Sequence, residues 1–324
     1  MKKSLTPEKI QKDYSTGNLG KENAADLLIS LIDSSDNTEI RVRSIKVLEK
    51  LQFQNEKTFK MFENLLISDE NASVRASVIE YLIQNFLEES LPALRWVIQH
   101  EKSPLVIKLL YDFIERSFSP QLKIIKKDLT LWVEDFSSKI GIIPQESIFF
   151  LDLEALFAKG KRSYEIDPSI YKYFEKLTDI KHGEPWLVIK KKHVEILNFN
   201  YFNWKFIKNN TDILTSLSKL QDLDVYLCSL RKYSHNQILL STIPESIGSL
   251  IFLKKLFLRR NGLKKLPVSM KNLSMLKELD ISYNKFEEIP KVINSFNKLE
   301  ILNIKHNFIQ NVPDSLSYYI KVIR

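Results

Sequence analysis

The sequence predicts an α/β chain in which an all-α solenoid is followed by a short cap and then by a solenoid of parallel strands. Two internal periods support this prediction: helical segments recur about every 34 residues in the first half, and strand-like segments recur every 23 residues in the second. Hydrophobic residues make up 44% of the chain, and only 7 of its 324 residues are glycine. This composition favours packed elements joined by short turns over disorder. We therefore expect domains at residues 1–140, 141–190 and 191–324.

The first period is helical and has three copies. The segment from Ala25, ADLLISLIDSSDNTEIRVRSIKVLEKL, aligns with the segment from Phe59, FKMFENLLISDENASVRASVIEYLIQ, at an offset of 34. A third segment from Leu91, LPALRWVIQHEKSPLVIKLLYDFI, fits at a further offset of 31. Each copy has the pattern of a helix, a short acidic turn and a second helix, and such pairs must stack to bury their apolar faces. We expect three to four pairs across residues 1–140, opened by a capping helix in LTPEKIQKDY.

This helical pattern resembles HEAT repeats, in which an acidic residue after the first helix and an arginine early in the second are typical. Asp36 and Glu70 occupy matching acidic positions, and Arg41 and Arg75 occupy matching arginine positions. The third copy has Val106 in place of the arginine. The resemblance therefore implies a polar ladder between repeats that stops at the third copy.

The segment between the two arrays, residues 141–190, matches neither period. QESIFFLDLEALFAKG has the pattern of an amphipathic helix ending at Gly160, DPSIYKYFEKL that of a second helix with Pro168 at its start, and PWLVI that of a short strand. A flexible linker would be richer in glycine and serine, and the end of a solenoid core has to be covered. We interpret this segment as a cap that also couples the two solenoids.

The second period has three gap-free copies, beginning at Leu253, Leu276 and Leu299. Their aligned columns hold Leu256, Leu279 and Leu302; Asn261, Asn284 and Asn307; and Pro267, Pro290 and Pro313. The L-x-L core sends alternate side chains of a short strand into the solenoid, and asparagine can satisfy buried backbone groups where the chain turns. Proline follows where no ladder N–H is needed. The pattern L-x-x-L-x-L-x-x-N-x-L with an apolar–proline pair resembles the leucine-rich repeat.

Two degenerate copies precede these three, so the repeats are expected to start near residues 194, 220, 253, 276 and 299. The copy at 220 has Cys228 in the asparagine position, where we expect a buried structural thiol, and it carries about ten extra residues. The 23-residue type resembles intracellular leucine-rich repeat proteins, including those linked to Ras-family GTPase signalling. The resemblance covers about residues 193–324, and it points to the fold more strongly than to a partner.

The composition indicates a soluble, cytoplasmic protein. The start of the chain has no apolar run behind its positive charges, and no window reaches the roughly 18 apolar residues of a membrane span. The single cysteine, Cys228, excludes an intrachain disulfide and fits a reducing compartment. The oligomeric state is not indicated.

The charge is uneven along the chain. Residues 1–190 hold 27 Lys and Arg against 29 Asp and Glu, whereas residues 191–324 hold 21 against 11. The basic second half could steer an anionic partner such as an acidic protein, a nucleic acid or a lipid surface. It could equally be a compositional drift without selection for binding, and the sequence leaves both interpretations open.

The sequence contains no pattern typical of an enzyme. Its five histidines show no metal-ligand spacing with one another, with cysteine or with a carboxylate. It has no glycine-rich phosphate loop and no G-x-S-x-G segment. We therefore expect no catalytic residues, no cofactor and no metal, and we expect the close acidic pairs to be ordinary surface.

The repeats do offer a surface for binding. The variable positions of each leucine-rich strand should face the concave side, and their columns are rich in Tyr, Arg and Phe, which are frequent at binding hot spots. Such positions could also collect these residue types by chance. We expect a protein partner on this face, so that the chain is a non-enzymatic scaffold or adaptor; the alternative is nucleic-acid or other polyanion binding by the basic half. The expected contact residues are Tyr201, Tyr226, Lys255, Phe257, Arg259, Arg260, Asp280, Tyr283, Asn303, Lys305 and His306.

Overall fold

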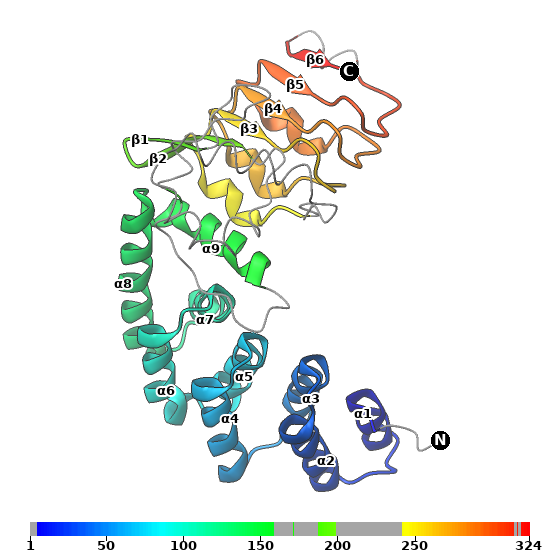
Figure 1. The fold of residues 1–324 in the computed structure, drawn as a ribbon, viewed down its shortest axis with the longest axis vertical. Helices are drawn as coiled ribbons and strands as arrows, with labels where there is room; N and C mark the ends of the chain where they lie inside the picture. Colours follow the sequence, from blue (N-terminus) through cyan, green and yellow to red (C-terminus); the bar gives the residue numbers. More distant parts are fainter. Residues whose placement is uncertain (1–4, 159–170, 172–186, 199–241, 314–315, 317–318) are drawn as a thin grey trace, which may run out of the picture. The chain divides into compact units, whose positions relative to one another are not determined.

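The computed structural model describes residues 5–158, 171, 187–198, 242–313, 316 and 319–324 (Figure 1). The chain divides into two compact units, Met1–Trp132 with Glu154–Ile166 and Val133–Leu153 with Asp167–Arg324. The first unit is helical and the second contains the sheet, so the predicted fold class is confirmed. None of the helices in the described ranges is long and apolar enough to cross a membrane.

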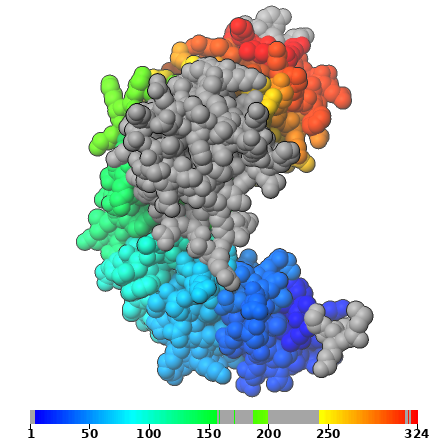
Figure 2. Space-filling model, in the orientation of Figure 1, coloured from blue at the N-terminus to red at the C-terminus, as the bar shows by residue number. Residues whose placement is uncertain are grey.

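The helical half is built of consecutive helix pairs, and the expected opening helix at Pro7 is confirmed. Figure 2 shows the surface of its first pairs as one continuous band from blue to cyan. The three predicted repeats are the pairs α2–α3, α4–α5 and α6–α7, and the second helices α3, α5 and α7 pack side by side. The helix bounds are α1 Pro7–Ser15, α2 Lys21–Ser34, α3 Thr38–Leu51, α4 Glu56–Ser68, α5 Ala72–Asn85, α6 Leu87–His100, α7 Pro104–Arg116, η1 Pro120–Leu122, α8 Lys123–Ile140 and α9 Pro144–Ala158.

Asparagine caps explain where several of these helices begin. Asn37 accepts a hydrogen bond from the Glu39 backbone N–H at 2.9 Å, and Asn55 accepts one from the Thr58 N–H at 2.7 Å. Asn71 does the same for the Ser73 N–H at 2.9 Å. Each bond satisfies one of the backbone donors that a helix leaves open in its first turn.

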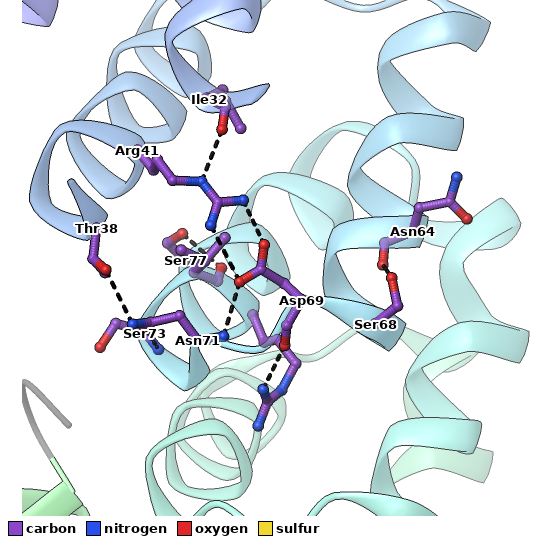
Figure 3. A network of polar contacts seen from close by, with 11 residues as sticks. Ile32, Thr38, Arg41, Asn64, Ser68, Asp69, Asn71, Ser73 and Ser77 are labelled. Carbon is purple, nitrogen blue, oxygen red and sulfur yellow. Dashed lines mark hydrogen bonds and ion pairs between the residues drawn. The ribbon is translucent and has the colours of Figure 1, made fainter. Parts of the chain in front are cut away.

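A polar ladder joins the three helical repeats, and Figure 3 shows its part between the first and second repeats. Arg41 in α3 donates to the Ile32 carbonyl at 2.8 Å and pairs with Asp69 of the next repeat. Arg75 in α5 makes two bonds to Glu101, of 2.7 and 2.8 Å, and a third to the Asp69 carbonyl. The acidic partner in the second copy is Asp69, not the neighbouring Glu70 that the alignment placed in that column.

The ladder ends at the third repeat because its arginine position holds an aliphatic side chain. Val106 is fully buried and has no group that could bind a carboxylate. This confirms the expected end of the ladder.

The second unit carries a six-stranded sheet in sequence order. β1 and β2 form an antiparallel hairpin, and every later pairing is parallel. A 3-10 helix follows Pro244, Pro267 and Pro290 in turn, which places these prolines on the return side, as predicted. The bounds are β1 Leu187–Lys190, β2 His193–Asn198, η2 Glu245–Ser249, β3 Lys255–Phe257, η3 Val268–Asn272, β4 Glu278–Asp280, η4 Lys291–Ser295, β5 Ile301–Asn303 and β6 Lys321–Ile323.

β2, from the first expected leucine-rich repeat, pairs directly with β3, with Leu197 opposite Leu256. Most of the expected copy that starts near residue 220, including Cys228, lies outside the described residues. The place of that copy in the repeat order therefore stays a prediction.

The asparagine column forms the predicted buried ladder of the leucine-rich half. Asn284 is 5% exposed, and its amide N–H groups donate to the Leu258 and Ile281 carbonyls, both at 2.9 Å. Its Oδ1 accepts from the Leu263 N–H at 3.1 Å. Asn307 repeats the pattern one turn later, with donation to the Ile281 carbonyl at 2.9 Å. Each side chain thus joins the backbones of two successive turns.

Within the second unit, residues of α9 contact β2 and η2. Glu146 is fully buried; its two oxygens accept from the Val194 N–H and contact His193 Nδ1, both at 2.8 Å. Burial raises the pKa of this carboxyl, and the bonds from Val194 and His193 partly oppose that rise. Ser246 at the start of η2 donates to Asp152 of α9. The role of residues 141–190 as a cap remains a proposal, which these contacts support.

Helix α9 is not amphipathic, contrary to expectation. Phe149, Phe150, Leu151 and Leu153 are each at most 1% exposed, although they point in several directions around the helix. The helix is therefore buried on several sides and not along a single face.

Candidate functional site

The candidate site lies where the strands of the leucine-rich half end and the chain turns toward the asparagine ladder. The residue before each ladder asparagine adopts left-handed backbone geometry, with φ of 59° at Arg260, 57° at Tyr283 and 55° at His306. This conformation costs a residue other than glycine about 1 kcal/mol. Hydrogen bonds from the Arg260 N–H to the Ser282 carbonyl and from the Tyr283 N–H to the Lys305 carbonyl, at 3.0 and 2.8 Å, hold the turns in register. The repeat therefore places three large side chains in one column.

These side chains form a stack centred on Tyr283. The Tyr283 and His306 rings have centroids 4.0 Å apart and an interplanar angle of 31°. The guanidinium carbons of Arg259 and Arg260 lie 4.5 and 4.9 Å from the Tyr283 centroid, within the range of cation–π attraction. We call these four residues the Tyr283 stack. It brings together four of the predicted contact residues from three successive repeats.

A row of ion pairs lies where the same strands begin. Lys254 pairs with Glu195 at 2.7 Å, Lys255 with Glu278 at 3.0 Å and Lys277 with Glu300 at 2.6 Å. The second and third pairs join residues one repeat period apart. None of these three glutamates was among the predicted contact residues, although opposite charges at a spacing of 23 could have indicated two of the contacts.

The ion pairs and the stack reduce the number of cations between residues 253 and 267 that are available to an anionic partner. Of the six cations between residues 253 and 267, two are neutralised by carboxylates and two stack on Tyr283. The remaining two, Lys264 and Lys265, are exposed beyond the asparagine position. Within residues 253–267, the positive charge is therefore divided among separate places.

The predicted contact residues differ in how exposed they are. Lys305 and His306 are exposed, whereas Asp280 and Asn303 are half-buried and bonded to each other at 3.1 Å. Phe257, which was expected among the exposed contact residues, is only 4% exposed. Its register neighbour Asn198 is fully buried too, which shows that this end of the face is covered. Tyr201 and Tyr226 lie outside the described residues.

The described residues contain no group of three or more His, Cys, Asp or Glu side chains that could hold a metal ion. A hollow of about 360 Å³ lies between η4 and the last described segment. No carboxylate, histidine, cysteine or lysine occurs among its described lining residues, which are Ile293, Asn294, Phe296, Asn297, Leu299, Leu316, Tyr319 and Ile320. This described lining therefore provides no acid, base or thiol nucleophile of the kinds that enzymes use most.

These geometries define a protein of two joined solenoids, one of helix pairs and one of short parallel strands. Comparison with known families agrees: HEAT repeats match residues 25–111, and a leucine-rich repeat matches residues 251–309. The chain is thus a fusion of the two repeat types, both of which act generically as protein-interaction scaffolds and are typically non-catalytic. No curated protein gives a significant match to the chain.

Proposed function

We propose that this chain is a non-enzymatic adaptor whose leucine-rich half binds a protein partner at the Tyr283 stack. The observation that carries the proposal is the stack itself, in which two arginines and a histidine pack against one tyrosine. Tyrosine and arginine are enriched at the centres of protein interfaces. Side chains already held in place lose less conformational entropy when a partner binds.

The neighbouring surface supports a protein partner over a polyanion. The lysines at the start of the strands are matched with Glu195, Glu278 and Glu300, which lowers the positive potential available to a nucleic acid. The half-buried Asp280 and Asn303 add hydrogen-bonding groups of both kinds at the edge of the stack. Lys305 and His306 complete the proposed contact set on its exposed side.

The experiment compares two double variants, each of which loses one cation and one aromatic ring. Arg260→Ala with Tyr283→Ala removes one cation and one aromatic ring from the stack. Lys264→Ala with Phe308→Ala removes the same kinds of group from exposed positions outside it, Phe308 being 65% exposed. Partners captured from native lysate by the parent chain are identified by mass spectrometry, and binding of the purified partner is then measured with each variant.

We expect the stack variant to lose at least about 100-fold in affinity, because hot-spot truncations cost 2 kcal/mol or more each. The control variant and both melting temperatures should be nearly unchanged. Equal binding by the parent chain and the stack variant would show that the Tyr283 stack is not the binding site. A captured nucleic acid whose affinity falls steeply with salt would favour the polyanion alternative.

The finer form of the proposal is a role in GTPase-type signalling in the cytoplasm. Its support is the resemblance of the 23-residue repeat to leucine-rich proteins of that kind, together with the single cysteine of the chain. Ras-type GTPases in both nucleotide states are accordingly the first purified proteins to include in the binding measurement.

A further inference from the structure

A second exposed surface lies in the helical unit, between α7 and the first half of α8. Phe118, in the connection between these helices, is 100% exposed, although an aromatic side chain of this size gains free energy on leaving water. Ile124 and Leu131 follow in α8 and are 58% and 55% exposed. Three large apolar side chains are therefore presented to solvent within fourteen residues of chain.

Helix geometry places the two α8 residues on one face. Ile124 and Leu131 are seven residues apart, close to two full turns, so they project in nearly the same direction, with Lys127 between them. Ile125 and Leu129, on the opposite side, are at most 1% exposed. The exposed pair is thus additional to the residues that dock α8, and it points away from the core.

Positive charge flanks Phe118 and Ile124, whereas Asp128, Glu134 and Asp135 lie within four residues of Leu131. Four cations and no carboxylate occur from Arg116 to Lys127. Arg116, Lys123 and Lys127 form no ion pair with any of the residues that the structure describes. The nearest carboxylates are already engaged: Glu115 pairs with Lys126 at 3.0 Å and Asp128 with Arg95 at 2.7 Å.

The residue types distinguish this surface from the Tyr283 stack. Protein interfaces are enriched in tyrosine and arginine and depleted in lysine, as at the stack. Here lysines flank isolated, protruding aliphatic and aromatic side chains. This is the arrangement of a helix that adsorbs to a lipid surface, where apolar groups enter the headgroup–acyl boundary and the lysine stems reach back to the phosphates.

We propose that this surface binds the headgroup region of an anionic lipid bilayer. Phe118, Ile124 and Leu131 insert at the interface, and Arg116, Lys123 and Lys127 contact lipid phosphates. The binding is peripheral and reversible. It is independent of the proposed protein-binding site, which lies in the other unit, so one can fail while the other holds.

The test is co-sedimentation of the full chain with vesicles of phosphatidylcholine alone and of phosphatidylcholine mixed with phosphatidylserine. We expect binding to the mixed vesicles that weakens with salt, and little binding to the neutral ones. Phe118→Ser should lower the partition coefficient about tenfold, because an aromatic side chain then no longer leaves water. Lys123→Gln with Lys127→Gln should lower it about tenfold or more, since each cation near an anionic surface contributes roughly fivefold.

Matched controls come from the other unit. Val268→Ser removes a 68% exposed apolar side chain, and Lys264→Gln with Lys265→Gln removes two exposed lysines. Both should bind mixed vesicles like the parent. Circular dichroism should be unchanged for every variant, because all the altered side chains are exposed.

Two outcomes overturn the proposal. The first is no binding of the parent chain to the mixed vesicles. The second is binding that survives Phe118→Ser and the α8 lysine pair, or that is lost with the leucine-rich controls. If the full chain does not bind vesicles but binds a protein or an RNA through this surface, the ligand is of another class and the lipid assignment is wrong.

Discussion

The two halves of the chain join successive repeats with different polar groups. In both halves a single repeat cannot bury its apolar face alone, and in both a polar ladder links successive copies. The helical half uses charged side-chain pairs, in which Arg41 reaches Asp69 and Arg75 reaches Glu101. The leucine-rich half uses neutral amides, in which Asn284 and Asn307 bond to main-chain groups of two turns.

The difference follows from where each fold leaves backbone groups without partners. A helix satisfies most of its N–H and C=O groups internally, so a helical ladder only has to join one repeat to the next. Strands β3, β4 and β5 are three residues long, and the rest of each turn is loop. Buried loop backbone must find partners elsewhere. Asparagine is suited to this because it donates and accepts at once. The asparagine ladder should therefore be harder to replace than the charged one.

The largest effect is expected for Asn284→Ala. This change leaves two buried carbonyls without one of their donors and the Leu263 N–H without its acceptor. The unfolding free energy of the second unit, measured in urea, should fall by about 4 kcal/mol, since the unsatisfied Leu263 N–H costs about 1–3 kcal/mol and each lost bond to a carbonyl costs about 1 kcal/mol. Asn272→Ala, at an exposed asparagine of η3, is the control and should change it little. A loss below about 1 kcal/mol at Asn284 would contradict the role of the amide ladder.

A somewhat smaller effect, about 3 kcal/mol, is expected for Arg75→Ala in the helical half. The substitution leaves Glu101, whose side chain is 7% exposed, without its guanidinium partner. Arg75→Met with Glu101→Gln should recover most of the loss, because glutamine still accepts from the Lys102 and Ser103 N–H groups that Glu101 now serves. Urea unfolding monitored by circular dichroism measures both variants. If the double variant is as unstable as the single one, the charged ladder is no easier to replace than the amide ladder.

The smallest loss of stability is expected for Gly248→Ala, which tests how closely η2 and η3 of successive repeats approach each other. A Cβ at Gly248 of η2 would lie 2.6 Å from the Ser269 carbonyl oxygen of η3, so backbone would have to move. Gly248→Ala should lower stability by about 2 kcal/mol, the usual cost of overpacking. Gly20 in the helical half has nothing within 4 Å of its Cβ position, and Gly20→Ala should be nearly neutral apart from a small capping cost. Equal melting temperatures for the two variants would show that η2 can move away from η3.

Periodicity predicted much of this molecule correctly. It placed the three helix pairs, the end of the charged ladder at Val106, the strand registers of the last three repeats and the roles of the asparagine and proline columns. It also selected Tyr283, Arg260 and His306, which the structure stacks together. Each of these depends on residues within one repeat or on the same position of the next, so a linear pattern carries the information.

The errors share one physical cause. Phe257 has the alternation of a surface residue and is buried, and α9 has the pattern of an amphipathic helix and is buried on several sides. In both cases the outcome depends on which other segment covers the residue. A local pattern predicts the direction in which a side chain points, but it does not specify which other segment packs against that side chain.

The sequence by itself determined the two repeat types, their phase and the residues that join one repeat to the next. Only the tertiary structure decided which cations are matched by carboxylates, which aromatic rings are covered and which strand is the neighbour of β2. The reason is that repeat contacts are short-range and recur with a fixed period. Burial and ion pairing between repeats also depend on distances between residues far apart in the chain, and these are set when the whole chain packs.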